Sequence, residues 1–69
     1  MPEYDLDNIF MYHAPKGDQQ RRYELLREYA KGLASLIVTS CPSSRERSLA
    51  LTKLEESVMW ANSSIARNE

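Results

Sequence analysis

The stretch "PSSRERSLA", residues 42–50, decides the fold because it joins two helical patterns with almost no chain between them. Pro42 ends the first pattern, since the residue before a proline avoids helical backbone angles. Ser43 is a good N-cap for the second pattern, and Glu46, three residues later, completes a capping box. So short a connection makes the two helices antiparallel neighbours. The sequence therefore predicts a helical hairpin.

Both helices carry one apolar stripe. The first helix is predicted over residues 18–40, with Asp18 as its N-cap, and the second over residues 43–67, beginning at Ser43 or Ser44. In each, apolar residues recur at spacings of three, four, three and four, which place them on one face. The stripes are Tyr23, Leu26, Ala30, Leu33 and Ile37, and Leu51, Leu54, Val58, Ala61 and Ile65. We expect the two stripes to pack against each other.

Residues 1–17 form an N-terminal arm ahead of the hairpin. Its stretch "NIFMYH", residues 8–13, holds four apolar residues in a row. The stretch favours a short helix or an extended arm, which either covers the open end of the hairpin or reaches a neighbouring subunit. Its expected anchors are Ile9, Phe10 and Met11. Tyr12 either adds an anchor or presents its ring to a ligand. The whole chain, residues 1–69, is expected to be a single all-α domain.

A chain of 69 residues builds a core of marginal stability, and a disulfide, a metal or oligomerisation usually supplements it. Cys41 is the single cysteine, so no internal disulfide can form, and together with His13 it cannot supply the four ligands of a structural zinc site. We therefore expect a homo-oligomer. Leu49 and Trp60 lie on the face of the second helix opposite its stripe. They are either subunit-interface residues, or residues that stay exposed or lie under the arm.

Composition excludes several classes of partner. The net charge is −1, which gives no signal for binding DNA or RNA. No apolar run approaches the roughly 20 residues that span a bilayer, and the N-terminus lacks the basic start and long apolar stretch of a signal peptide. A lone cysteine suits a reducing compartment. We expect a cytoplasmic protein that uses neither a membrane nor nucleic acid.

Arg45 and Arg47 stand at the positive pole of the second helix, where cations are mildly unfavourable. In one interpretation they are solvated or form surface ion pairs with Glu46 or Glu55, and such pairs stabilise a fold by about 0–1 kcal/mol. In the other interpretation they bind an anion. Helix N-termini attract anions, and an arginine fork fits phosphate oxygens. Hydroxyls such as that of Ser48 would add donors. An oligomer that gathers several such termini would form a concentrated anion site.

Nothing in the sequence indicates catalysis. Cys41 and His13 could serve as a nucleophile and a base, but no orienting third residue or oxyanion motif accompanies them. No glycine-rich phosphate loop and no paired-acid pattern is present. We expect a protein that is not an enzyme and that uses no cofactor and no metal.

Two tracts carry a resemblance to a known family: "YHAPKGDQQRRYELLREYAKGLA", residues 12–34, and "SSRERSLALTKLEESVMWANSSIAR", residues 43–67. They resemble the phage family of helical-hairpin cyclic-oligonucleotide sponges, the anti-CBASS proteins, whose hairpin is shared with one type of anti-Thoeris sponge. The resemblance implies a homohexamer in the host cytoplasm that sequesters cyclic dinucleotide or cyclic trinucleotide messengers without cleaving them. The host's CBASS effector is then never activated.

The resemblance also implies site residues. A tyrosine before the first helix stacks on a base and a basic residue fifteen positions later meets phosphate; here these are Tyr12 and Arg27. In members that take cyclic trinucleotides, an arginine at the start of the second helix gathers around a three-fold site. Arg45 matches it, with Arg47 and Ser48 as further candidates. The alternative function is a small helical module that docks on another protein through the face that carries Leu49 and Trp60.

Overall fold

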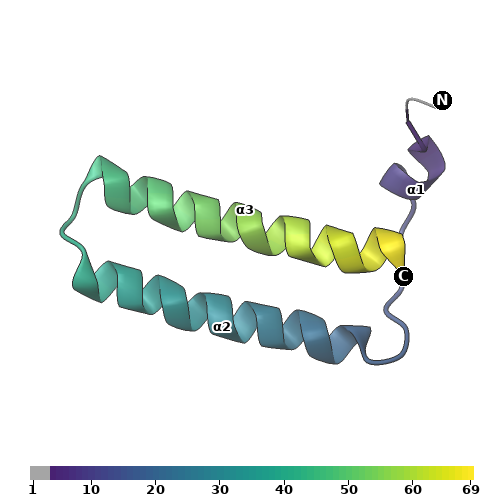
Figure 1. The fold of residues 1–69 in the computed structure, drawn as a ribbon, viewed down its shortest axis with the longest axis horizontal. Helices are drawn as coiled ribbons and strands as arrows, with labels where there is room; N and C mark the ends of the chain where they lie inside the picture. The colour runs from purple at the N-terminus through teal and green to yellow at the C-terminus, as the bar shows by residue number, and fades with distance from the viewer. Residues whose placement is uncertain (1–3) are drawn as a thin grey trace.

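The computed structural model describes residues 4–69, which form three helices and no strand. The helices are α1 (Leu6–Phe10), α2 (Gln19–Ser40) and α3 (Arg45–Asn68). The long helices α2 and α3 lie antiparallel, and α1 lies beyond their open end, the end at which α2 begins and α3 ends (Figure 1). The molecule measures 45 × 29 × 16 Å. The predicted all-α helical hairpin is confirmed.

α2 begins at Gln19, one residue after the predicted start. Asp18 occupies the N-cap position as predicted, but its side chain makes no capping hydrogen bond. It accepts a hydrogen bond from Arg22 Nε at 3.2 Å instead. Gln19 Oε1 accepts from the backbone N–H of Lys16 at 3.1 Å, and Gly17 makes the turn with a φ of +59°, which glycine adopts without strain.

α3 begins at Arg45, and its N-cap is Ser44. The Ser44 hydroxyl accepts a hydrogen bond from the backbone N–H of Arg47 at 3.1 Å. The predicted capping box of Ser43 and Glu46 is therefore wrong, because Arg47 and not a glutamate stands three residues after the cap.

Arg47 lies at the positive pole of α3, but its side chain binds the end of α2. Its Nη1 donates to the backbone carbonyls of Val38 and Cys41, both at 3.3 Å. Val38 lies in the last turn of α2 and Cys41 is its C-cap, so these oxygens are at the negative end of α2. Arg47 thus sits in the first turn of one helix and neutralises the end of the other.

The predicted stripes form the contact between α2 and α3, with one exception. All five stripe residues of α3 are half-buried, and so are four of the five in α2. Leu33 is 47 % exposed, so its prediction as a packing residue is wrong. Ala34 is half-buried in its place. Both positions fit a helical period of 3.6 residues from Ala30, and spacing alone does not choose between them.

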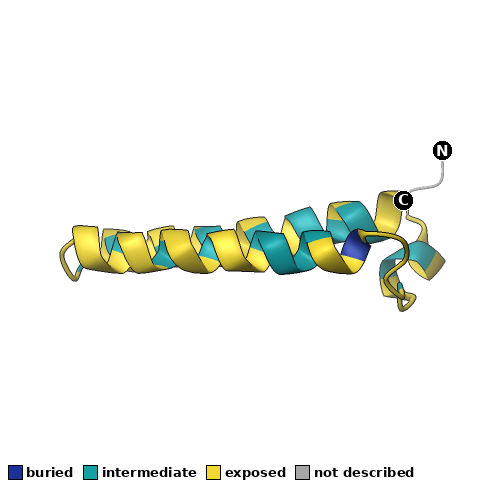
Figure 2. Ribbon diagram, turned by 90° about the horizontal axis from the view of Figure 1, so that it is seen from below, coloured by how far each residue is buried: buried dark blue, intermediate teal, exposed yellow. Residues whose placement is uncertain are grey.

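The single chain buries almost none of its side chains completely. Among residues 4–69 no hydrophobic residue is fully buried, and Gln19, 4 % exposed, is the single buried residue. Figure 2 shows it as the one dark blue stretch, at the start of α2. Trp60 is 63 % exposed, and Leu49, Met59 and Tyr29 are exposed as well. The hairpin by itself therefore leaves large apolar side chains in water, Leu49 and Trp60 included.

The arm is a short helix followed by a loop that returns to α2 (Figure 1). Asp5 caps α1 by accepting from the N–H of Asn8 at 3.1 Å, and the His13 ring bonds the Asn8 carbonyl at 2.8 Å. Of the expected anchors only Ile9 is half-buried, whereas Phe10 and Met11 are exposed. The prediction of those two as anchors is wrong for the single chain: Phe10 follows Ile9 by about 100° around α1, and Met11 lies beyond the end of α1.

Candidate functional site

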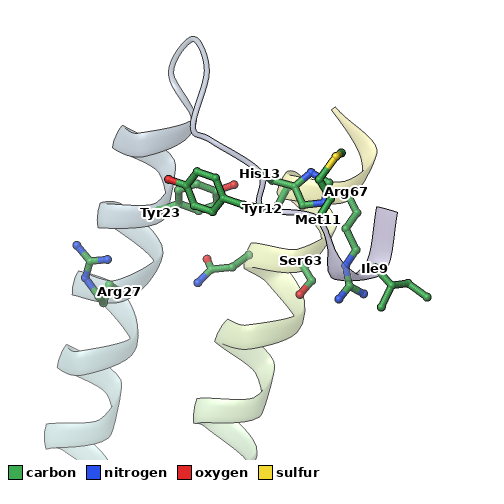
Figure 3. A pocket seen from close by; sticks show the side chains of 10 residues that line it. Ile9, Met11, Tyr12, His13, Tyr23, Arg27, Ser63 and Arg67 are labelled. Carbon is green, nitrogen blue, oxygen red and sulfur yellow. The ribbon is translucent and has the colours of Figure 1, made fainter. Parts of the chain in front are cut away.

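A pocket of about 470 Å³ lies at the open end of the hairpin, a size common among small-molecule sites. Residues from the arm, α2 and α3 line it (Figure 3). They are Ile9, Met11, Tyr12, His13, Tyr23, Arg27, Asn62, Ser63, Ala66 and Arg67. We call it the open-end pocket. Its lining combines the loop after α1 with the first half of α2 and the last turns of α3.

Tyr12 and Arg27, fifteen residues apart in the chain, both line the open-end pocket. Tyr12 is 82 % exposed, so its ring face is free for stacking. In Figure 3 the Tyr12 and Tyr23 side chains lie at the top of the pocket, and Arg27 projects from α2 below Tyr23. Tyr23 and Arg27 are four residues apart and therefore share one face of α2. The structure thus brings together an aromatic platform and a cation.

Two guanidinium groups border the open-end pocket, Arg27 from α2 and Arg67 from the last turn of α3. The ion pairs within residues 4–69 involve Arg22 and Lys53 as cations, and neither pocket arginine is among them. Each is thus available to an anion. Arginine binds phosphate through a planar fork of donors, so the pocket suits a ligand that carries phosphate and a flat ring.

A polar cluster beside the pocket ties the loop to the end of α3. Glu69, the C-cap of α3, accepts hydrogen bonds from Arg22 Nη1 at 2.8 Å and from Gln19 Nε2 at 3.2 Å. Lys16 Nζ donates to the Glu69 carbonyl at 2.7 Å. The Arg22 and Gln19 hydrogen bonds hold the pKa of Glu69 down at about 2, and the bond to Glu69 raises the pKa of Arg22 further above its usual value.

The three remaining predicted site residues, Arg45, Arg47 and Ser48, lie at the other end of the hairpin. Arg45 and Ser48 are exposed in the first turn of α3, and the Arg47 guanidinium binds the end of α2. With a rise of about 1.5 Å per residue, the eighteen residues from Arg45 to Ser63 place the two ends about 27 Å apart. Within one protomer these residues do not join the open-end pocket.

The model of one protein family, described as "Acb2/Tad1, hairpin domain", matches residues 2–66, nearly the whole chain. The chain belongs to this family. The resemblance to the anti-CBASS and anti-Thoeris sponges is thereby confirmed, and the Acb2/Tad1 hairpin fits a sponge role against cyclic nucleotide signals. No curated protein and no solved structure gives a significant match to the chain.

The Acb2/Tad1 match covers every lining residue of the open-end pocket except Arg67. Sequence reasoning missed Tyr23, which it assigned to helix packing, and also missed Asn62, Ser63 and Arg67. The i, i+4 spacing of Tyr23 and Arg27 was a usable signal, because it places a ring beside the predicted cation. No sequence signal pairs Arg67 with the arm, because their proximity depends on where the loop crosses the hairpin.

Two further observations on this Acb2/Tad1 hairpin concern metal ligands and membrane spans. Across residues 4–69 no three His, Cys, Asp or Glu side chains are grouped so that they could hold a metal ion. No helix in that part of the chain has both the length and the apolar character needed to cross a membrane.

Proposed function

We propose that this protein is a phage sponge that binds and sequesters cyclic dinucleotides in the open-end pocket without cleaving them. The observation that carries the proposal is the meeting of Tyr12 and Arg27 in one pocket. Stacking of a base on the Tyr12 ring contributes about 1–3 kcal/mol. The Arg27 guanidinium then binds a phosphate by charge-assisted hydrogen bonds. Sequestration in the host cytoplasm keeps the messenger from the CBASS effector.

The proposal includes no chemistry on the ligand. Cys41 and His13, the one conceivable nucleophile and base, stand at opposite ends of the hairpin. The His13 ring is held by the Asn8 carbonyl at 2.8 Å. A general base has to reach the nucleophile within hydrogen-bond distance, which this separation does not allow within one protomer. A sponge needs no more than binding.

The sponge is proposed to be a homohexamer. A single protomer leaves Trp60, Leu49 and other large apolar side chains exposed, and aromatic side chains are enriched where subunits meet. Packing of these faces between subunits would supply the core that a 69-residue hairpin lacks. A neighbouring subunit beside the exposed Tyr12 would also enclose a ligand on a second side.

A second site, for cyclic trinucleotides, is proposed at the end of the hairpin where the turn joins α2 to α3. Arg45 is exposed there at the positive pole of α3, and Ser48 adds a hydroxyl one turn later. Arg47 is the weaker candidate, because its guanidinium already binds the carbonyls of Val38 and Cys41. Three copies of Arg45 around a three-fold axis would give the concentrated anion site that one terminus alone does not.

Calorimetry against a panel of cyclic dinucleotides and cyclic trinucleotides, beside size-exclusion chromatography with light scattering, tests the proposal. A sponge binds members of the panel, its melting temperature rises with the ligand, and heat denaturation returns the ligand intact. A cleaved ligand would indicate an enzyme. A protein that ignores every nucleotide and co-purifies with another protein would support the alternative, docking through the exposed face of Leu49 and Trp60.

A further inference from the structure

One buried polar atom of a residue that lines the open-end pocket has no hydrogen-bond partner within residues 4–69. Asn62, on α3, lines this pocket with Tyr12 and Arg27. Its Oδ1 is buried, and no donor within residues 4–69 reaches it. It is the single side-chain oxygen or nitrogen in that part of the chain with this property. Because buried polar atoms are nearly always paired, an unpaired acceptor at a pocket indicates a partner from outside the protomer.

We propose that Asn62 reads the base of the bound cyclic dinucleotide and selects adenine. This inference rests on the proposed function. A side-chain amide offers an acceptor and a donor side by side, and they match the N6 amino group and the N7 of adenine. Presented with the same edge, guanine offers two acceptors and uracil an oxygen, so in that pose both leave Oδ1 without a donor. The terminal torsion of asparagine is broad, so the amide can turn to the ligand.

Three other side chains of the pocket, those of Tyr12, Arg27 and Ser63, do not discriminate between bases. Stacking on Tyr12 tolerates any base, because every base has a flat face. A phosphate contact from Arg27 positions the ligand and carries no information about its bases. The Ser63 hydroxyl donates or accepts equally well. Of these four side chains, the Asn62 amide is the one whose donor and acceptor differ in position, which is what base selection requires.

The test compares Asn62→Leu with the wild-type protein. Leucine has a similar volume and removes the amide. Asn68→Leu is the matched control, because Asn68 is on the same helix and outside the pocket, where its Nδ2 bonds the Ser64 carbonyl at 2.9 Å. Dissociation constants are measured by calorimetry for cyclic di-AMP, cyclic di-GMP and cyclic di-UMP, and the melting temperature and mass of each protein are measured without ligand.

We expect wild-type protein to bind cyclic di-AMP about ten-fold more tightly than the other two ligands. Asn62→Leu erases that preference, leaves the other two affinities unchanged, and does not lower the melting temperature of the free protein. Asn68→Leu keeps the preference. Should Asn62→Leu fail to fold, Asn62→Ala gives the same comparison of the three ligands.

Three results would overturn the inference. Equal affinity of the wild-type protein for all three ligands removes base selection and leaves the proposed function standing. An equal loss for all three in Asn62→Leu, with a lower melting temperature or a smaller mass, assigns the missing donor to a neighbouring subunit. Absence of binding for every cyclic nucleotide in the wild-type protein overturns the proposed function together with this inference.

Discussion

Tyr12 stands between the arm and the hairpin with its ring almost wholly in water, which is unfavourable for a side chain with no other partner. The loop holds it there, because the next residue, His13, is tied to the Asn8 carbonyl at 2.8 Å. A ring on a fixed loop loses little freedom when a base stacks on it. Because so little conformational entropy is lost on stacking, an exposed ring in this position suits a ligand platform.

Tyr12→Ala should weaken cyclic dinucleotide binding by about five-fold to 150-fold, because it removes one stacking contact of about 1–3 kcal/mol. Calorimetry measures the loss, and light scattering should show an unchanged mass. Tyr4→Ala is the matched control, since Tyr4 is an exposed tyrosine outside the pocket. An affinity for cyclic dinucleotide equal to that of the wild-type protein would remove Tyr12 from the site.

Glu69 gives the fold a pH dependence in acid. Its pKa falls from an ordinary 4.5 to about 2 in the folded protein, so it binds fewer protons folded than unfolded. Its contribution to stability is therefore present above about pH 4.5 and is lost as the pH falls toward 2. Added salt should reduce this contribution, because the cluster with Arg22 is exposed to solvent.

The measurement is the denaturant midpoint of the wild-type protein and of Glu69→Gln as a function of pH. We expect Glu69→Gln to unfold at a lower denaturant concentration near neutral pH and to approach the wild-type midpoint near pH 2. Glu55→Gln is the matched control, an exposed carboxylate of α3 outside the cluster. If the difference in denaturant midpoint between wild-type protein and Glu69→Gln stayed constant over this pH range, the pH dependence would not come from Glu69.

At the scale of the element, the hairpin turn depends on contacts between the ends of its two helices. Ser44 caps the start of α3, and Arg47, one turn later, binds the last carbonyls of α2. The end carbonyls of a helix have no partner within the helix, so a cation there both pairs them and meets the negative pole. A single side chain therefore joins the two helices.

Arg47→Ala should lower the free energy of unfolding by about 1 kcal/mol, the usual net contribution of such hydrogen bonds. Arg45→Ala is the matched control, and we expect it to change stability by less than half as much, because Arg45 is exposed. Urea denaturation followed by circular dichroism at one fixed protein concentration measures both. Similar losses in the two variants would show that charge in the first turn, and not the contact with α2, matters.

At the scale of the whole molecule, the long hairpin has two faces and one protomer covers one of them. The stripes of α2 and α3 face each other, and the opposite face of α3 leaves Trp60 exposed. Aromatic side chains of this size bury 150–250 Å² and are enriched where subunits meet. The proposed hexamer would place this face between copies of the chain.

Trp60→Ala should lower the mass of the assembly measured by light scattering, because it removes the largest apolar side chain of that face. The effect should grow on dilution, as it does for any association equilibrium. Glu55→Ala, an exposed change on the same helix, is the matched control. A mass identical to that of the wild-type protein at all concentrations would remove Trp60 from the interface.

Sequence reasoning predicted the two long helices, their antiparallel pairing and most of the residues between them, because these depend on period and on a short connection. It misplaced the cap at Ser43, since Ser43 and Ser44 are equally good caps by residue type and the structure uses Ser44. It also counted Leu33 where Ala34 packs, since both fit one helical period.

By itself the sequence determined the helical hairpin, because apolar spacing and Pro42 act through neighbours along the chain. The resemblance carried by its motifs indicated Tyr12 and Arg27. The tertiary structure decided that these two meet, that Tyr23, Asn62 and Arg67 join them, and that Arg47 binds α2. The reason is physical: those contacts join residues far apart in the chain, and the path of one loop and the packing of two helices set them.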